Sequence, residues 1–294
     1  MYNGIINVYK EAGFTSFDVV AKMRGILGQR KIGHTGTLDP DATGVLPVVV
    51  GNATKLVDML TDKKKEYVAE LKLGVRTDTL DASGKVLETK EVTCNEEQIR
   101  EAVISFVGDI MQIPPMYSAL KVDGQKLCDL ARQGKEVERK PRPVTIHEIE
   151  ILNIDMEGGP TVKIRVLCSK GTYIRTLCDD IGTKLNCGAV MISLIRTMSG
   201  AYSLDTAHTL TELQSLKDEG RLDEVIIPVD SVFADYPKYE AKGETLRLIR
   251  NGNQVQINAM NTEKIRMYDG DEFIALYEVK DKKKNIYKVQ TMFL

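Results

Sequence analysis

Hydrophobic and polar residues alternate along several short stretches of the chain, and other stretches repeat apolar residues at helical spacing. A period of two is typical of a strand with one buried face, whereas apolar residues three and four positions apart indicate an amphipathic helix. The alternation predicts strands over residues 5–8, 67–73, 162–168 and 189–197. Strands separated by occasional helices favour an α+β domain.

Helical spacing begins twice after a residue that can cap a helix. Thr15 and Ser16 precede a segment that ends at Gly28, and Asn95 precedes one that ends at Gly108. The apolar positions expected to face the core are Phe17, Val20, Met23 and Leu27 in the first helix, and Ile99, Ala102, Val103 and Phe106 in the second. Each helix would therefore bury one face.

A third helix is predicted after a turn formed by residues 169–172. Its buried stripe consists of Ile174, Leu177, Cys178, Ile181 and Leu185. Tyr173 and Arg175 fall off this stripe at the first turn, so we expect their side chains to be free to point at a ligand. The strand that follows is expected to carry on one side Val190, Ile192 and Leu194.

Residues 114–143 interrupt this pattern with a polar, helix-poor stretch that begins and ends with proline. The stretch contains seven Lys or Arg and four Asp or Glu, an excess of three positive charges. It is either a solvated loop or an arm that binds a phosphate backbone.

A second change in composition follows Asp230. Residues 231–294 carry a net charge of +2, whereas residues 1–230 carry −4. Short strand-like runs in this C-terminal part are split by turns at Asn251-Gly252 and Asp269-Gly270. They predict a small β-rich module.

The chain has 294 residues, 43% of them hydrophobic, which suffices for one large domain or for a large domain with a small one. Its net charge of −2 produces no overall basic field, so a nucleic acid would have to bind local basic patches. No signal segment follows Met1 and no apolar run approaches ~18 residues. We therefore expect a cytoplasmic protein without membrane spans.

Cysteine and histidine usage argues against a metal site. The five cysteines include no Cys-x-x-Cys pair, and the three histidines lie far apart in the sequence. A disulfide framework is also disfavoured, because the expected compartment is reducing. Most of the cysteines are expected to be small core residues.

The residues most indicative of chemistry lie between Gly33 and Gly44, in the run Gly-His-Thr-Gly-Thr-Leu-Asp-Pro-Asp-Ala-Thr-Gly. Three glycines, one histidine and two carboxylates exceed what an ordinary turn needs. Glycine permits a positive φ or a close backbone approach, and Asp39-Pro40 fixes a bend beside a carboxylate. The loop is therefore either catalytic or a ligand clamp, with Asp39 or Asp41 available for chemistry.

Four motifs in this order resemble those of the TruB family of tRNA pseudouridine synthases. Residues 33–46 are similar to the family's active-site motif, and residues 64–67, Lys-Lys-Glu-Tyr, to its second motif. Residues 168–175, followed by Asp-Asp-Ile-Gly at 179–182, resemble the third. Residues 194–200 fit the strand after it, so the resemblance covers residues 4 to about 230.

The resemblance implies a pseudouridine synthase fold, with a central mixed, mostly antiparallel sheet flanked by helices. It implies a catalytic domain over residues 1–230 with an RNA-contacting arm at about 117–143, and a PUA-like RNA-binding domain over 236–294. The implied reaction converts the uridine at position 55 in the T loop of tRNA to pseudouridine, without cofactor or metal. The partner would be the tRNA T stem-loop, and we expect a monomer.

The resemblance also assigns roles to residues. Asp39 takes the place of the nucleophile, whether it adds to C6 or C1′ or abstracts a proton, and Arg175 that of the cation favouring its charged form. Tyr67 would stack on the uracil ring, and His34 would fill the space left by the flipped nucleotide. The other implied substrate-binding residues are Tyr173 and Leu194 at the uridine pocket, and Lys55 near the active-site loop.

Two rival functions fit part of this pattern. A phosphate-binding nucleotide loop is also Gly-rich, but this one lacks the Gly-Lys-Ser/Thr ending, and Asp39 would repel phosphate. A non-catalytic tRNA-binding or tRNA-folding protein would use the same basic patches. Such a binder gains nothing from a carboxylate in its RNA pocket, so Asp39 distinguishes it from an isomerase.

Overall fold

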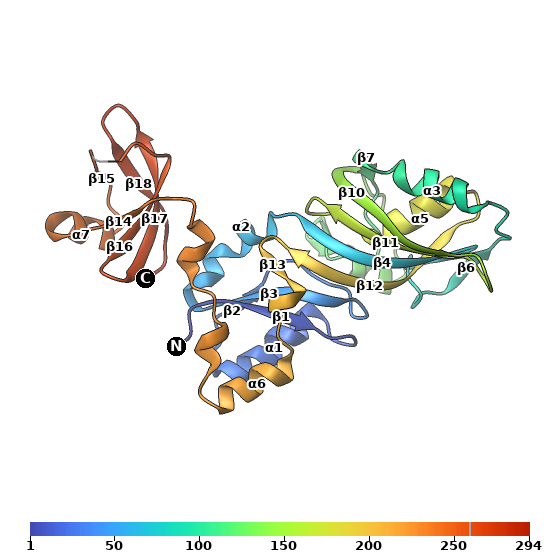
Figure 1. Cartoon of the computed structure of the whole chain (residues 1–294), viewed down its shortest axis with the longest axis horizontal. Helices are drawn as coiled ribbons and strands as arrows, with labels where there is room; N and C mark the ends of the chain where they lie inside the picture. Colours follow the sequence, from blue (N-terminus) through green and yellow to red (C-terminus); the bar gives the residue numbers. More distant parts are fainter. Residues whose placement is uncertain (259) are drawn as a thin grey trace.

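A nine-stranded sheet runs through the larger part of the molecule, and a second sheet forms a smaller C-terminal domain (Figure 1). This arrangement is seen in a computed structural model, which describes residues 1–258 and 260–294. The strands of the large sheet are β1 (Gly4–Lys10), β2 (Ile32–His34), β3 (Thr43–Val50), β4 (Lys65–Leu73), β7 (Gly108–Gln112), β10 (Arg142–Asp155), β11 (Thr161–Cys168), β12 (Ala189–Ser199) and β13 (Tyr202–Ser203).

The large sheet is mixed and mostly antiparallel, as predicted. Its order is β1-β3-β12-β4-β11-β10-β7, with β2 attached to β3 and β13 to β12. Only β12 and β3 pair in parallel among these strands of the described chain. This parallel pair places the end of the Gly33–Gly44 loop beside β12, because Gly44 lies opposite Arg196.

Two pairs of helices flank the sheet and give it separate cores (Figure 1). Helices α3 (Glu96–Ile104) and α5 (Ile174–Lys184) bury their apolar faces against β4, β10, β11 and β12. Helices α1 (Ser16–Leu27) and α6 (Leu210–Asp218) do the same against β1 and β3. The predicted α+β class is confirmed.

The predicted helix caps are present, but one predicted core residue is wrong. Thr15 and Asn95 both form capping boxes, and Gly28 ends α1 in the left-handed conformation. Phe17, however, is 63% exposed, because the buried face of α1 is set by Val19, Val20, Met23 and Leu27. Helix α3 ends at Ile104, before the predicted stop at Gly108.

The inward face predicted for β12 is also partly wrong. The strand has a bulge between Met191 and Ser193, where its pairing with β4 shifts by one residue. A bulge reverses the alternation of side chains beyond it. As a result Ala189, Met191 and Leu194 join the core, whereas Ile192 is 39% exposed.

The stretch at 114–143 is less irregular than its sequence suggested. It contains the hairpin of β8 (Lys121–Val122) and β9 (Gln125–Lys126), followed by a short helix, α4 (Leu127–Arg132). Leu127 and Leu130 of α4 are buried, so this helix has an apolar face of its own. Another hairpin, β5 (Val75–Thr77) with β6 (Val86–Thr89), projects from the sheet end near α3 (Figure 1).

The C-terminal domain contains the predicted β-rich module together with a helix. Its elements are β14 (Lys238–Glu240), α7 (Gly243–Arg250), β15 (Val255–Gln256), β16 (Lys264–Asp269), β17 (Glu272–Asp281) and β18 (Ile286–Met292). Phe233, Phe273 and Phe293 pack together where this domain joins the body, in a core that also includes Ile5 and Val45. A β-rich domain of this kind is consistent with a PUA-like module.

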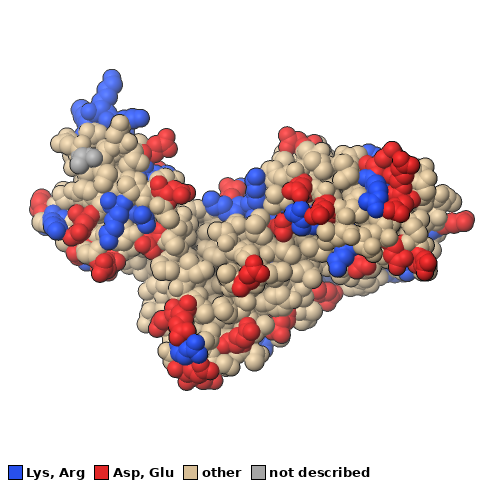
Figure 2. Space-filling view, viewed as in Figure 1, with Lys and Arg blue, Asp and Glu red and all other residues tan. Residues whose placement is uncertain are grey.

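The molecule is hollowed between the C-terminal domain and the body, and basic side chains gather in this hollow (Figure 2). The remaining short helices are η1 (Gly51–Leu56), α2 (Val57–Thr61), η2 (Leu204–Thr206), η3 (Leu222–Val225) and η4 (Val229–Phe233). Within residues 1–258 and 260–294, every helix is too short or too polar to cross a lipid bilayer.

Candidate active site

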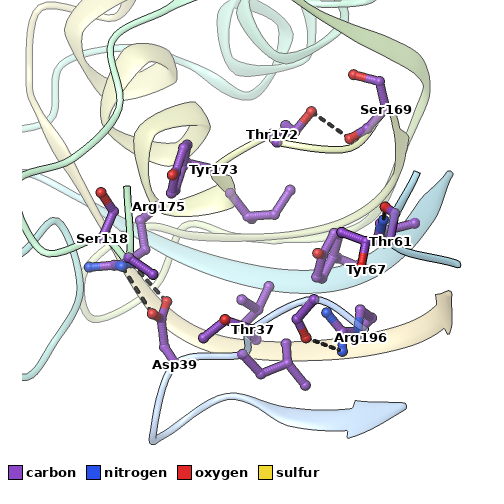
Figure 3. Close-up of a pocket in the computed structure, with 17 residues that line it drawn as sticks. Thr37, Asp39, Thr61, Tyr67, Ser118, Ser169, Thr172, Tyr173, Arg175 and Arg196 are labelled. Atoms are coloured by element: carbon purple, nitrogen blue, oxygen red, sulfur yellow. Dashed lines mark hydrogen bonds and ion pairs between the residues drawn. The ribbon is translucent and has the colours of Figure 1, made fainter. Parts of the chain in front are cut away.

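A pocket of about 260 Å³ opens where the loop between β2 and β3 meets the start of α5 (Figure 3). Elements far apart in the sequence line it, because the strand order places β4 and β12 side by side beneath this loop. Five of the predicted site residues lie in its wall: Asp39, Tyr67, Tyr173, Arg175 and Leu194. His34 lines an adjoining groove.

Asp39 and Arg175 form a two-pronged ion pair at this pocket (Figure 3). The Nε atom of Arg175 lies 2.9 Å from Oδ2 of Asp39, and its Nη2 donates to Oδ1 at 3.0 Å. Paired contacts of this kind fix the carboxylate in direction as well as in position. The 36% exposed side chain of Asp39 therefore faces the pocket in one orientation.

Arg175 lines the pocket as expected, but only 5% of its side chain is exposed, so the prediction that it falls off the buried stripe of α5 is wrong. Its Nη1 donates to the carbonyl of Thr79 at 3.0 Å and lies 3.4 Å from a carboxylate oxygen of Asp81. Its Nη2 also donates to the carbonyl of Tyr117 at 2.7 Å. A guanidinium held by four groups is rigid, and it positions Asp39 accordingly.

Asp81 is a site residue that the sequence did not reveal. It lies between β5 and β6, where it accepts hydrogen bonds from Thr79 and Ser83 that hold its carboxylate toward Arg175. Nothing in its local sequence distinguishes it from a turn aspartate. Only the packing of this hairpin against α5 and β12 brings it to the site.

Burial raises the pKa of Asp39 above its ordinary value. The Arg175 guanidinium opposes this increase, and the negative charge of Asp81 adds to it. Desolvation disfavours the charged form of a carboxylate, whereas a nearby cation favours it. The pocket thus contains a weakly solvated carboxylate whose ionised form depends on one arginine, which suits a nucleophile or a general base.

The backbone around Asp39 is held from two sides. The buried Lys10 donates to the carbonyls of Pro40 at 2.8 Å and Ala42 at 2.6 Å. On the other side, the hydroxyl of Ser16 accepts a hydrogen bond from the backbone N–H of Leu38 at 2.9 Å. The bend at Asp39-Pro40 is therefore fixed to the end of β1 and to the start of α1.

Gly44 allows β3 to approach β12 closely. Its φ is +105°, and a Cβ atom at this position would lie 2.2 Å from the carbonyl oxygen of Arg196. Gly36 also has a positive φ, whereas Gly33 does not. The space beside Gly44 is thus filled by β12 and is not open to a ligand.

Two buried cations at the inner end of the pocket were missed as site residues. Arg196 is 1% exposed and donates through Nε to the carbonyl of Val45 at 2.7 Å and through Nη2 to that of Gly36 at 3.2 Å. Lys65 donates to the carbonyls of Thr61 and Lys63. Burial, with a further contribution from Arg196, lowers the pKa of Lys65 to about 8.

Tyr67 lies over this inner end of the pocket, on β4 (Figure 3). Burial raises the pKa of its phenol, and the charge of Arg196 partly offsets the increase. The ring is therefore neutral and presents a flat surface to the pocket, as stacking on a base requires. Neither Arg196 nor Lys65 was distinguishable from an ordinary basic residue in the sequence, because burial depends on distant strands.

Tyr173 is positioned through its backbone. Its N–H donates to the side chain of Gln112 at 2.8 Å, and the amide of Gln112 donates back to the carbonyl of Tyr173 at 3.0 Å. These bonds fix the residue that precedes α5. Leu194, on β12 beyond the bulge, supplies an apolar wall both to the pocket and to the adjoining groove.

His34 ends β2, and its side chain faces the groove beside the pocket. Burial and the charge of Arg196 lower the pKa of its imidazole, so the ring is neutral near pH 7. Its Nδ1 is buried without a hydrogen-bond partner among the described residues. A neutral ring is suited to occupy a space between bases.

Lys55 is the one predicted site residue that lines neither this pocket nor the adjoining groove. It lies on η1, and its Nζ donates to the carbonyl of Met292 at 2.6 Å, near the end of β18. Its predicted role in substrate binding stays a prediction. Its contact in the structure is with the C-terminal domain.

Comparison with known families identifies the chain. Residues 24–174 match the description TruB family pseudouridylate synthase (N terminal domain), and residues 175–234 match the tRNA pseudouridylate synthase B C-terminal domain. The chain belongs to the TruB family of pseudouridylate synthases. This result agrees with the resemblance of the four sequence motifs.

Relatives cover nearly the whole chain. A protein named tRNA pseudouridine synthase B from Lachnoclostridium phytofermentans is 54% identical over 307 residues, which cover 99% of this chain and 100% of that protein. One of the same name from Alkaliphilus oremlandii is 51% identical over 256 residues, 87% of this chain and 84% of that protein. The TruB-family similarity thus extends into the C-terminal domain.

Solved structures show the same fold. A chain from the crystal structure of a Cbf5-Nop10-Gar1 complex has a TM-score of 0.72 and 30% identity, over 99% of this chain and 85% of that one. A chain from an H/ACA RNP bound to a substrate RNA containing 2′-deoxyuridine has a TM-score of 0.71 and 27% identity over the same shares. The pseudouridine synthase fold expected from the sequence is confirmed.

Proposed function

We propose that this TruB-family isomerase, which converts uridine to pseudouridine in tRNA, acts on the uridine at position 55 of the T loop. Asp39 is its catalytic carboxylate. The observation that carries the proposal is the fixed Asp39–Arg175 pair at the entrance of a pocket whose inner end is covered by the Tyr67 ring. The pocket brings together a carboxylate of fixed orientation and a flat aromatic ring, and the reaction needs both.

The reaction exchanges one bond to the sugar for another. The bond between N1 and C1′ breaks, the uracil turns, and C5 bonds to C1′, after which C5 loses its proton and N1 gains one. Asp39 assists this exchange by adding to C6 or C1′ or by taking the proton. Tyr67 presents a ring face that tolerates rotation of the base, and Arg175 keeps Asp39 ionised.

The uridine must leave its stack in the folded T loop before it reaches Asp39. Extrusion of a base costs a few kcal/mol in lost stacking, and a neutral ring such as that of His34 can occupy the gap. The arm at 117–143 is the segment we propose to close over the T loop, because it already contacts Arg175 through Tyr117. The C-terminal domain would bind the acceptor stem, and the active unit would be a monomer.

The position of modification can be tested directly. A tRNA transcript is incubated with the protein, treated with a carbodiimide that forms a stable adduct with pseudouridine, and mapped by primer extension. We expect one stop that reports position 55 and no such stop for a transcript with cytidine at that position. Tight binding of the unmodified transcript without any stop would favour the non-catalytic tRNA-binding protein instead.

A further inference from the structure

The exposure of Phe17 is unusual for its place in the molecule. It lies in the first turn of α1 with 63% of its side chain exposed, whereas Val19, Val20 and Met23 of the same helix are at most 2% exposed. A single exposed apolar side chain is ordinary. Phe17 differs because it lines a groove that leads to the catalytic carboxylate.

This groove has a volume of about 850 Å³ and is continuous with the Asp39 pocket, since Leu38, Asp39 and Leu194 line both. A second exposed apolar side chain, Ile192, also lines it. The bulge in β12 gives Ile192 this position. Two exposed apolar side chains from distant parts of the chain thus meet in one groove beside the site.

Phe17 has a fixed position relative to Asp39. Its neighbour Ser16 binds the backbone of Leu38 in both directions, accepting from its N–H at 2.9 Å and donating to its carbonyl at 3.3 Å. Ser16 directly precedes Phe17, and Leu38 directly precedes Asp39. In addition, the Arg24 guanidinium lies 5.8 Å from the centre of the Phe17 ring, two helical turns along α1.

The charges of the groove indicate a neutral occupant. Asp41 and Asp129 line it together with Lys126 and Arg132, so a phosphate would meet carboxylates as well as cations. A nucleobase is uncharged and has a flat face that stacks on aromatic rings. When the target uridine is extruded, its neighbours in the loop lose a stacking partner and need another.

We propose that Phe17 is a stacking platform for a nucleobase adjacent in sequence to the target uridine. Phe17 is then a positioning residue that holds the RNA strand beside the pocket and touches no reacting atom. The inference rests on the proposed function, because it requires an RNA strand whose target base occupies the Asp39 pocket. It explains why α1, which buries Val19, Val20, Met23 and Leu27, leaves Phe17 exposed.

The test uses the full chain and a T stem-loop RNA with 2-aminopurine at the 5′ or the 3′ neighbour of the target uridine. Stacking quenches 2-aminopurine fluorescence. We expect a change on binding at one of the two positions, and its loss in Phe17→Ala together with about tenfold weaker binding. Phe17→Tyr keeps an aromatic face, so it should retain both the signal and the affinity.

The matched control is Leu87→Ala, because Leu87 is 65% exposed on β6 and lies outside the groove. It should behave as the wild type. If Phe17→Ala and Leu87→Ala give the same affinity and fluorescence, the stacking role is wrong. Tritium release from C5-labelled RNA by the wild type, measured in parallel, separates this failure from failure of the proposed function itself.

Discussion

At the residue scale, the central feature is a pair of side chains 136 positions apart in sequence that meet at 2.9 and 3.0 Å. Motif resemblance alone indicates both Asp39 and Arg175. Asp81, Arg196 and Lys65 were missed, because what distinguishes them is burial beside the site. Burial arises from strands distant in sequence, which no local pattern reports.

The first prediction concerns pH. The reaction needs ionised Asp39, and burial raises the pKa of this carboxyl above 3.8. Activity is therefore lost as pH falls through the raised pKa and is full above it. Arg175→Lys removes one of the two contacts that favour the charged form. Because a hydrogen bond to a charged group contributes about 1.5–3 kcal/mol, kcat/KM should fall at least ~10-fold. Its acid limb should move to higher pH.

The measurement is a single-turnover rate profile across the acid range with labelled tRNA. Arg165→Lys is the control, since Arg165 pairs with Glu66, Glu148 and Glu150 on the sheet surface away from the pocket. Its profile should overlay that of the wild type. An acid limb that stays in place or moves to lower pH in Arg175→Lys would contradict the assigned charge coupling.

At the element scale, periodicity predicted the strands and helices but not their irregularities. The alternation along β11 and the caps of α1 and α3 were correct because they depend on neighbours in sequence. The bulge in β12 depends on its register with β4, which a single strand cannot reveal. Ile192 was therefore assigned to the wrong face. Phe17 was assigned incorrectly because the face that α1 buries is set by Val19, Val20, Met23 and Leu27.

The close approach of β3 and β12 leads to the second prediction. Gly44→Ala places a Cβ atom 2.2 Å from the carbonyl oxygen of Arg196 at a φ of +105°. We expect a loss of about 3 kcal/mol or more in the free energy of unfolding, because strain and a backbone clash add. The measurement is urea denaturation.

Gly25→Ala provides the matched control. Gly25 lies within α1, and a Cβ atom there would have nothing within 4 Å. Replacing an unstrained helical glycine by alanine should increase the free energy of unfolding by about 0.5–1 kcal/mol. Equal stability of the two variants would show that β3 can move away from β12, and the fixed geometry of the catalytic loop would then be wrong.

At the scale of the whole molecule, a net charge of −2 conceals a separation of charge. The C-terminal part is net positive, and basic side chains gather in the hollow and at the tip of the C-terminal domain (Figure 2). The change in composition predicted a β-rich module within residues 231–294, and the sheet of the C-terminal domain spans Lys238 to Met292. The contact of this domain with the body could not be predicted, because it joins residues that are distant in sequence. Phe233 and Phe293 pack in one core with Ile5 and Val45.

The third prediction concerns salt. Lys282, Lys283 and Lys284 are exposed in the turn between β17 and β18. Each phosphate neutralised by a lysine contributes roughly 0.7 to 0.9 log units of affinity per log unit of salt. Replacing all three lysines by glutamine should lower the slope for tRNA binding by up to about 2 to 3 units. The rate at saturating tRNA should not change.

The control for this experiment is Lys163→Gln, since Lys163 is exposed on β11 and lies outside both the pocket and the groove. It should leave the salt slope as in the wild type. An unchanged slope in the triple variant would exclude the C-terminal tip from the tRNA interface.

The catalytic role of Asp39 is tested most directly by the release of tritium from tRNA labelled at C5 of uracil. Wild type and Asp39→Asn are compared at saturating tRNA. Asparagine has nearly the same shape but cannot act as a nucleophile or a base. We predict stoichiometric release by the wild type, no detectable release by Asp39→Asn, and tRNA affinity within about threefold for the two proteins. Release by Asp39→Asn at a rate near that of the wild type would contradict the catalytic role of Asp39.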